Sequence, residues 1–299
     1  MKCLLDDMIM QKGQPVTAGS KMLQNFPSPI NATVVDKLTE NGYEIVGRIS
    51  MGEFGITSAE IDFQADFILC NDLFGHYRKL AVDKGYFYIH PTYGTVSRYG
   101  LIPLDCSMDQ IGVLCKDLRK GMALLDCISG NDPKDGAMLP SFDRTQKAPK
   151  VAQPRLEFSQ AYKQVKYILN CAEISNNISR YDGVKFGYRA PDAKNLNELY
   201  IKSRSQGFGK HTKLTAITGT MLLTQDYYKP YYEKAMKIRR LIKESIHFDS
   251  YNIIQSEINE LPQLAGLPSI SFMHKGQATQ LVANIKDENL LLSAWEEMA

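Results

Sequence analysis

The feature that most constrains the fold is a helix pattern followed directly by a strand pattern, between residues 31 and 49. Asn31 can cap a helix through its side chain, and Asn41-Gly42 offers the positive φ that ends one. The apolar residues at helical spacing between them are Val34, Val35 and Leu38. The run at 44–49 then reads as a strand. A helix that leads into a strand is the unit of an α/β fold, which we expect for this chain.

Further patterns continue this alternation along the chain. The aromatic run at 86–89 predicts a strand, and the glycines and prolines of 91–112 predict loops and short strands over a sheet. Apolar residues at helical spacing predict more helices, and short β-prone runs predict two late strands. The helices are expected at 117–129, 156–180, 226–243 and 287–297, and the strands at 251–255 and 280–285.

We expect one domain over residues 1–299. Core patterns fill two blocks, 12–136 and 156–299, and the segment between them is polar. This segment, about 131–155, holds Pro133, Pro140, Pro149 and Pro154. Proline and polar residues break regular structure, so the segment is expected to be a linker inside the domain.

Composition narrows the class of protein. Of the 299 residues, 44% are hydrophobic and 23% are charged, which is enough for a large core. The net charge of +2 does not indicate a nucleic-acid-binding surface. Neither a signal peptide nor an apolar run of bilayer length is visible, so no membrane association is expected. The six cysteines form no CxxC pair, which is typical of reduced thiols in a cytoplasmic protein.

Three stretches resemble a known family. They are HPTYGTVSRYGLIPLDCSMDQ at 90–110, the segment from Thr17 to Phe54 that contains SKMLQNFPSP, and SRYDGVKFGYR at 179–189. The chain resembles amidase-signature enzymes, and among them the A subunits of glutamyl-tRNA(Gln) amidotransferases. The resemblance implies an α/β fold with a mixed central sheet flanked by helices. We expect a trimmed version, because pieces of the family pattern are missing.

The resemblance also implies an activity and partners. The A subunit supplies ammonia from glutamine to a complex that converts Glu-tRNA(Gln) into Gln-tRNA(Gln), and the complex acts as a ligase in protein biosynthesis. B- and C-type subunits are therefore the expected partners. No cofactor is expected for this chain.

The family's catalytic residues are not visible at their positions. The family uses a serine nucleophile, a second serine in a cis peptide and a lysine, in the general scheme of a hydroxyl activated by a base. The resemblance places Asp6 at the lysine position and His76 at the nucleophile position. The glycine-serine run of the second serine is absent, because the segment between Phe54 and Asp72 is too short for it.

Substrate residues are partly retained. The resemblance assigns Arg180 to an arginine that holds the amino-acid end of glutamine, a role that suits a bidentate guanidinium. Alternatively, Arg180 forms a salt bridge at a helix end. Glu257 or Glu260 stands near the position of an acidic partner. The five histidines are isolated in sequence, so no metal site is expected.

Three hypotheses follow from the sequence. The first is a catalytically degenerate A-subunit-like protein, a pseudoenzyme that keeps its surfaces for B- and C-type subunits or is a decayed gene copy. The second is an active amidase or glutaminase with a rebuilt site, in which His76 acts on Cys70, Ser58 or Ser97; a hydrogen-bonded histidine without a catalytic role is the alternative for His76. The third is a non-catalytic module that binds partner subunits, or a small amino acid or amide near Arg180.

Overall fold

A computed structural model describes residues 1–59, 61, 63–140 and 147–298 of the chain. Within these residues, nine strands form one mixed sheet in the order β2-β1-β3-β5-β4-β8-β9-β7-β6. The strands are β1 Lys2–Asp6, β2 Glu44–Ile49, β3 Phe67–Asn71, β4 Phe87–His90, β5 Ile111–Cys115, β6 Val151–Ala152, β7 Ile253–Glu257, β8 Ser269–His274 and β9 Gln277–Ala283. β1 runs parallel to both β2 and β3, and β6 runs parallel to β7, whereas the other neighbours are antiparallel.

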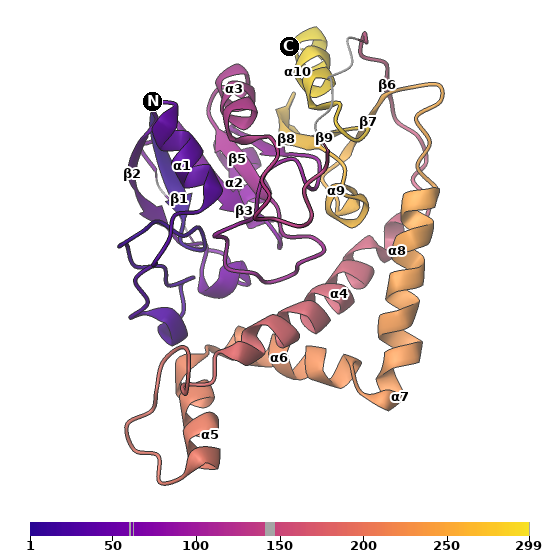
Figure 1. Cartoon of the computed structure of the whole chain (residues 1–299). Coiled ribbons are helices and arrows are strands. Elements are labelled where there is room, and N and C mark those ends of the chain that lie inside the picture. The colour runs from indigo at the N-terminus through magenta and orange to yellow at the C-terminus, as the bar shows by residue number, and fades with distance from the viewer. Residues whose placement is uncertain (60, 62, 141–146, 299) are drawn as a thin grey trace.

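Helices cover the sheet and extend beyond it (Figure 1). They are α1 Thr33–Glu40, α2 His76–Lys84, α3 Leu118–Ile128, α4 Tyr162–Asn177, α5 Leu196–Gly207, α6 Lys210–Leu222, α7 Gln225–Tyr227, α8 Lys234–Glu244, α9 Leu261–Ala265 and α10 Glu288–Met298. A π-helical turn at Tyr228–Glu233 joins α7 to α8. The expected α/β class, with a mixed sheet flanked by helices, is confirmed.

The two faces of the sheet carry different cores. Successive side chains of a strand point to opposite faces. On β3, Leu69 joins the large core that also contains residues of α1, α3 and α10, whereas Ile68 and Cys70 join a smaller cluster with Tyr77 of α2. Both faces of this central strand are therefore apolar, as expected for a strand buried between helical layers.

Most predicted elements are confirmed, with shifts at their ends. The strand at Glu44–Ile49 has the expected bounds. The helix α3 begins after Asp117, whose side chain accepts the N–H of Lys120 at 3.1 Å. The helix expected at 156–180 is α4 with short 3₁₀ turns on both sides, at Ser159–Ala161 and Ile178–Arg180.

Two local predictions differ from the structure. The cap role of Asn31 is wrong: α1 is preceded by Ala32 and has no side-chain cap, and Asn31 accepts the N–H of Lys12 at 2.7 Å and donates to Asp36. The segment expected to be a linker contributes β6 to the edge of the sheet; its residues 141–146 lie outside the described residues.

Candidate functional site

The sheet brings Asp6 close to the start of α2. β1 and β3 are parallel neighbours, and Asp6 ends β1 while Asn71 ends β3. The carboxyl ends of parallel strands meet at one edge, where α/β proteins place their sites. The chain then turns at 72–75 into α2. As a result, the hydroxyl of Tyr77 donates a hydrogen bond to Oδ2 of Asp6 at 2.8 Å, although 71 residues separate them.

Asp6 is buried in this position, and its charge is poorly compensated. Its Oδ1 accepts the N–H of Met8 at 2.9 Å. Burial raises the pKa of Asp6 to about 7, although the hydrogen bonds from Met8 and Tyr77 oppose that shift. Asp7 adds a like charge beside it. The position that the resemblance assigns to a basic lysine therefore holds a carboxyl group that is partly protonated near neutral pH.

His76 begins α2 and is half-buried. Its Nε2 lies 3.3 Å from the carbonyl oxygen of Ile56, and its ring stacks on Phe74 with ring centroids 6.4 Å apart. These contacts agree with a hydrogen-bonded histidine. The backbone N–H groups of Tyr77 and Arg78, which open the helix, donate to the carboxylate of Asp72 at 2.8 and 3.1 Å. These two backbone donors, which could stabilise an oxyanion at this helix start, are thus already occupied.

Among the described residues, no hydrogen bond joins His76 to any of the candidate nucleophiles. The thiol of Cys70 is buried, and burial raises its pKa well above the usual value, so it stays protonated. Ser97 donates to Asp132 at 2.6 Å. Ser58 lies in an exposed segment outside the helices and strands. Within the part of the chain that the structure describes, no hydrogen bond joins His76 to Cys70: His76 contacts the carbonyl oxygen of Ile56, and the thiol of Cys70 lies near the carbonyl oxygen of Ile68.

A buried ionic network, not predicted from the sequence, supports the start of α2. Arg78 donates from Nε to Asp72 at 2.9 Å and from Nη2 to Glu260 at 3.3 Å and Gln263 at 2.9 Å. Lys166 of α4 also donates to Glu260 and, at 2.6 Å, to Gln263. The network therefore ties α2, α4 and α9 together under the turn that carries His76.

The charges of this network shift each other's pKa values. Burial by itself would raise the pKa of Glu260, but Lys166 and Arg78 lower it to about 2. Burial lowers the pKa of Lys166 to about 8, against the pull of Glu260. Glu260, one of the two acids considered for substrate binding, is thus committed to a buried ion pair.

Arg180 lies elsewhere, at the end of α4. Its Nε and Nη2 donate to the carbonyl and side-chain oxygens of Asn177, each at 2.8 Å. It lines a cavity of about 790 Å³, and neither Glu257 nor Glu260 lines it. The other cations at this cavity are Lys21, Lys185 and Arg189, beside an apolar wall that includes Phe26 and Tyr181. The alternative role of Arg180, a salt bridge at a helix end, is not seen among the described residues, and its role in substrate binding stays a prediction.

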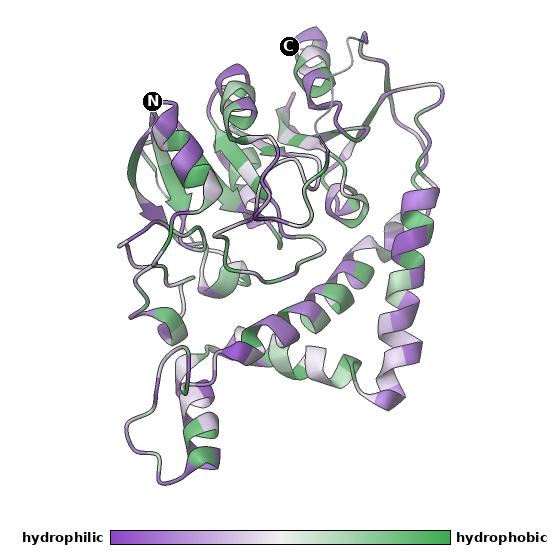
Figure 2. Cartoon of the chain, in the orientation of Figure 1, coloured by the Kyte–Doolittle hydropathy of each residue, from purple (hydrophilic) through white to green (hydrophobic). Residues whose placement is uncertain are grey.

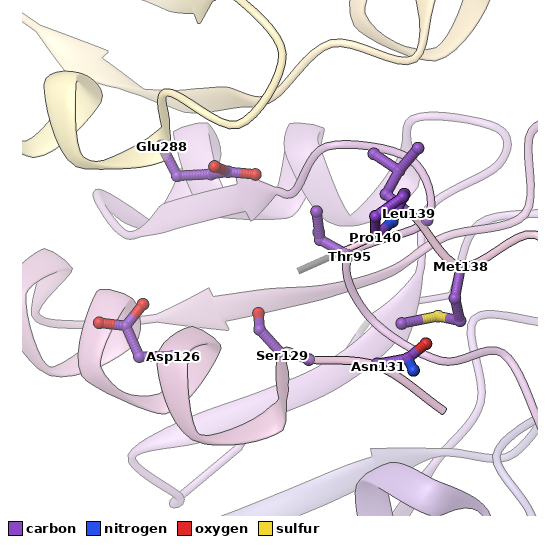
Figure 3. Close-up of a pocket in the computed structure, with 10 residues that line it drawn as sticks. Thr95, Asp126, Ser129, Asn131, Met138, Leu139, Pro140 and Glu288 are labelled. Atoms are coloured by element: carbon purple, nitrogen blue, oxygen red, sulfur yellow. The ribbon is translucent and has the colours of Figure 1, made fainter. Parts of the chain in front are cut away.

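A second, smaller cavity of about 250 Å³ is separate from the cavity at Arg180 (Figure 3). It lies between the end of α3, which contributes Asp126, and the start of α10, which contributes Glu288. Oε1 of Glu288 accepts the N–H of Thr92 at 2.9 Å, which fixes the turn above β4. Asp6, His76 and Arg180 do not line this cavity.

No group of three metal-ligating side chains occurs among the residues that the structure describes. Over the same residues, none of the helices combines the length and the apolarity that crossing a bilayer requires.

Comparison with known proteins adds the family context. A family model described as Amidase matches residues 3–60, 84–163 and 155–256, and its matches leave out 61–83. The chain is similar to the A subunit of glutamyl-tRNA(Gln) amidotransferase of Trichodesmium erythraeum, with 31% identity over 96% of this chain and 81% of the relative. The corresponding protein of Wolinella succinogenes is 34% identical, over 80% of this chain and 68% of the relative.

Solved structures share the fold. The crystal structure of the glutamyl-tRNA(Gln) amidotransferase A subunit from Thermotoga maritima has a TM-score of 0.66 and 23% identity, covering 98% of this chain and 81% of that chain. The native peptide amidase from Stenotrophomonas maltophilia has a TM-score of 0.74 and 17% identity, covering 100% and 82%. At these identities the likeness concerns the fold alone.

Proposed function

Because the chain belongs to the amidase family, we propose that it is a shortened member similar to the A subunit of glutamyl-tRNA(Gln) amidotransferase in which the family's amide hydrolysis is lost. The observation that carries the proposal is the setting of Asp6. A carboxyl group with a pKa of about 7, hydrogen-bonded by Tyr77, stands where the resemblance expects a lysine base. Its ionised form carries the charge opposite to that of a lysine.

Two further observations support this proposal. The segment that the family model leaves unmatched, 61–83, contains His76 and the turn before it. The N–H donors at the start of α2 are held by Asp72, so an oxyanion finds these two donors occupied. In this proposal the chain keeps the family fold as a non-catalytic partner of B- and C-type subunits. Its six cysteines are free thiols, which suits a reducing compartment such as the cytoplasm.

Glutaminase activity tests the proposal. The purified chain, alone and mixed with a B- and C-type pair of subunits, is expected to release no more ammonia from glutamine than His76→Ala does, because no activated nucleophile is present. An intact A subunit of the amidotransferase serves as the positive control. Ammonia release by the wild-type chain that is lost in His76→Ala would contradict the proposal and support the rebuilt enzyme.

A second candidate function is favoured by the cavity at Arg180. The cavity volume of about 790 Å³ lies in the range of small-molecule sites, and the charged side chains that line the cavity are cationic. A carboxylate ligand, such as a small amino acid or its amide, would meet the guanidinium of Arg180. In this alternative the chain binds the ligand without turning it over.

Binding at Arg180 is measured as a shift in melting temperature. If the second candidate is right, glutamine or glutamate raises the melting temperature of the wild-type chain, and Arg180→Gln abolishes the shift. Arg119→Gln is the matched control, since Arg119 is exposed and does not line the cavity. An equal shift in Arg180→Gln would exclude this role, and no shift in the wild type would exclude the ligand.

A further inference from the structure

The helix α6 has its small and its large side chains on unexpected faces. At 100° per residue, Thr212, Thr215 and Gly219 fall on one side, and they are buried, as is Leu222 at the end of the helix. The opposite side carries the large apolar residues Leu214, Ile217 and Met221, whose exposed fractions are 54%, 68% and 42%. Amphipathic helices of soluble proteins normally show the reverse arrangement.

The buried side is fixed by the approach of α4. A Cβ atom added to Gly219 would lie 1.9 Å from the carbonyl oxygen of Cys171, so the two backbones meet where only glycine fits. In Figure 1, α6 lies below α4, away from the sheet, and Figure 2 shows green, hydrophobic turns along it. Packing within the chain accounts for the small residues of α6. It does not account for the outward Leu214, Ile217 and Met221.

The segment of the chain that contains this apolar stripe is basic. Lys210 and Lys213 fall on the same side of α6, and together with Leu214, Ile217 and Met221 they form what we name the α6 outer face. Residues 196–244, from α5 to α8, contain ten Lys and Arg against four Asp and Glu, a net charge of +6. The whole chain has +2, so the rest of the molecule carries −4.

From this geometry and charge we infer that the α6 outer face docks an acidic amphipathic helix of another protein. Such a helix would bury its apolar side on Leu214, Ile217 and Met221 and place carboxylates beside Lys210 and Lys213. A second copy of this chain, docked through the same face, would oppose cation to cation. Nucleic acid would gain from the lysines but not from an aliphatic stripe. The inference does not depend on the proposed function.

The test uses a labelled helical peptide of about 18 residues, five turns, with leucine on one side and glutamate on the other. Fluorescence anisotropy with the full chain is expected to show binding that weakens as salt rises. Ile217→Ser is expected to reduce the affinity at least about tenfold through lost apolar burial, and Lys210→Glu with Lys213→Glu to a similar extent. Controls are Val46→Ser, an apolar residue 41% exposed on β2, and the exposed Lys12→Glu.

Several results would overturn the inference. A peptide with lysine in place of glutamate that binds equally well would remove the charge argument. Wild-type affinity in Ile217→Ser would remove the apolar one. Absence of peptide binding, with Ile217-dependent binding of single-stranded RNA or anionic lipid vesicles, would assign the face to those occupants. Dimerisation of the chain alone that Ile217→Ser abolishes would assign it to a second copy.

Discussion

Replacing Arg78 with methionine is expected to lower the free energy of unfolding by about 3–5 kcal/mol, the usual cost of removing one member of a buried ion network. Arg78 is buried and is the shared partner of Asp72 and Glu260. Methionine fills a similar volume but leaves both carboxylates without that cation. Urea unfolding monitored by circular dichroism measures the loss.

Arg240 provides the matched control. It pairs with Glu244 at 2.7 Å, but its side chain is 80% exposed, so Arg240→Met should leave the free energy of unfolding nearly unchanged. A loss in Arg78→Met as small as that of the control would show that the network under α2 does not stabilise the fold.

The second large effect concerns pH and Asp6. Its folded pKa of about 7 exceeds the usual value of 3.8, so between these pH values the folded state holds a proton that the unfolded state has released. Stability from this group is therefore fully present below pH 3.8 and is lost as pH rises through 7. Asp6→Asn cannot titrate. Relative to wild type, the free energy of unfolding of this variant should increase by on the order of 2–4 kcal/mol from about pH 4 to about pH 8.

The measurement is a series of urea unfolding curves of both proteins over that pH range. Asp36→Asn, at a half-buried carboxyl in the first turn of α1, serves as the control. If the difference in free energy of unfolding between wild type and Asp6→Asn stays constant with pH, Asp6 is ionised throughout this range. That result would contradict the raised pKa of Asp6.

The sequence was sufficient to predict the fold class. The strand at Glu44–Ile49 was predicted with its observed bounds because its β-prone residues lie between residues that interrupt regular secondary structure. The resemblance assigned Asp6 and His76 to one site, and that assignment stays a prediction; the hydrogen bond that the structure shows runs to Asp6 from Tyr77, the residue after His76.

Other features left no signal in the sequence. Lys166 lies in a helical pattern where lysine normally faces solvent, and only the tertiary structure shows that it is buried against Glu260. The strand β6 has two residues, too few for a periodic pattern. The cavity at Arg180 gathers residues near 21–26, 102–103 and 180–189, which only folding brings together.

The proposed loss of a working nucleophile is tested most directly by covalent trapping. The purified chain would be incubated with a diazoketone analogue of glutamine, which alkylates activated nucleophiles of glutaminases, and its intact mass measured with and without excess glutamine. The account predicts no mass increase that glutamine prevents. A glutamine-protected adduct mapped to His76, Cys70 or Ser58 would contradict it, because such an adduct requires a substrate pocket and an activated nucleophile at the same place.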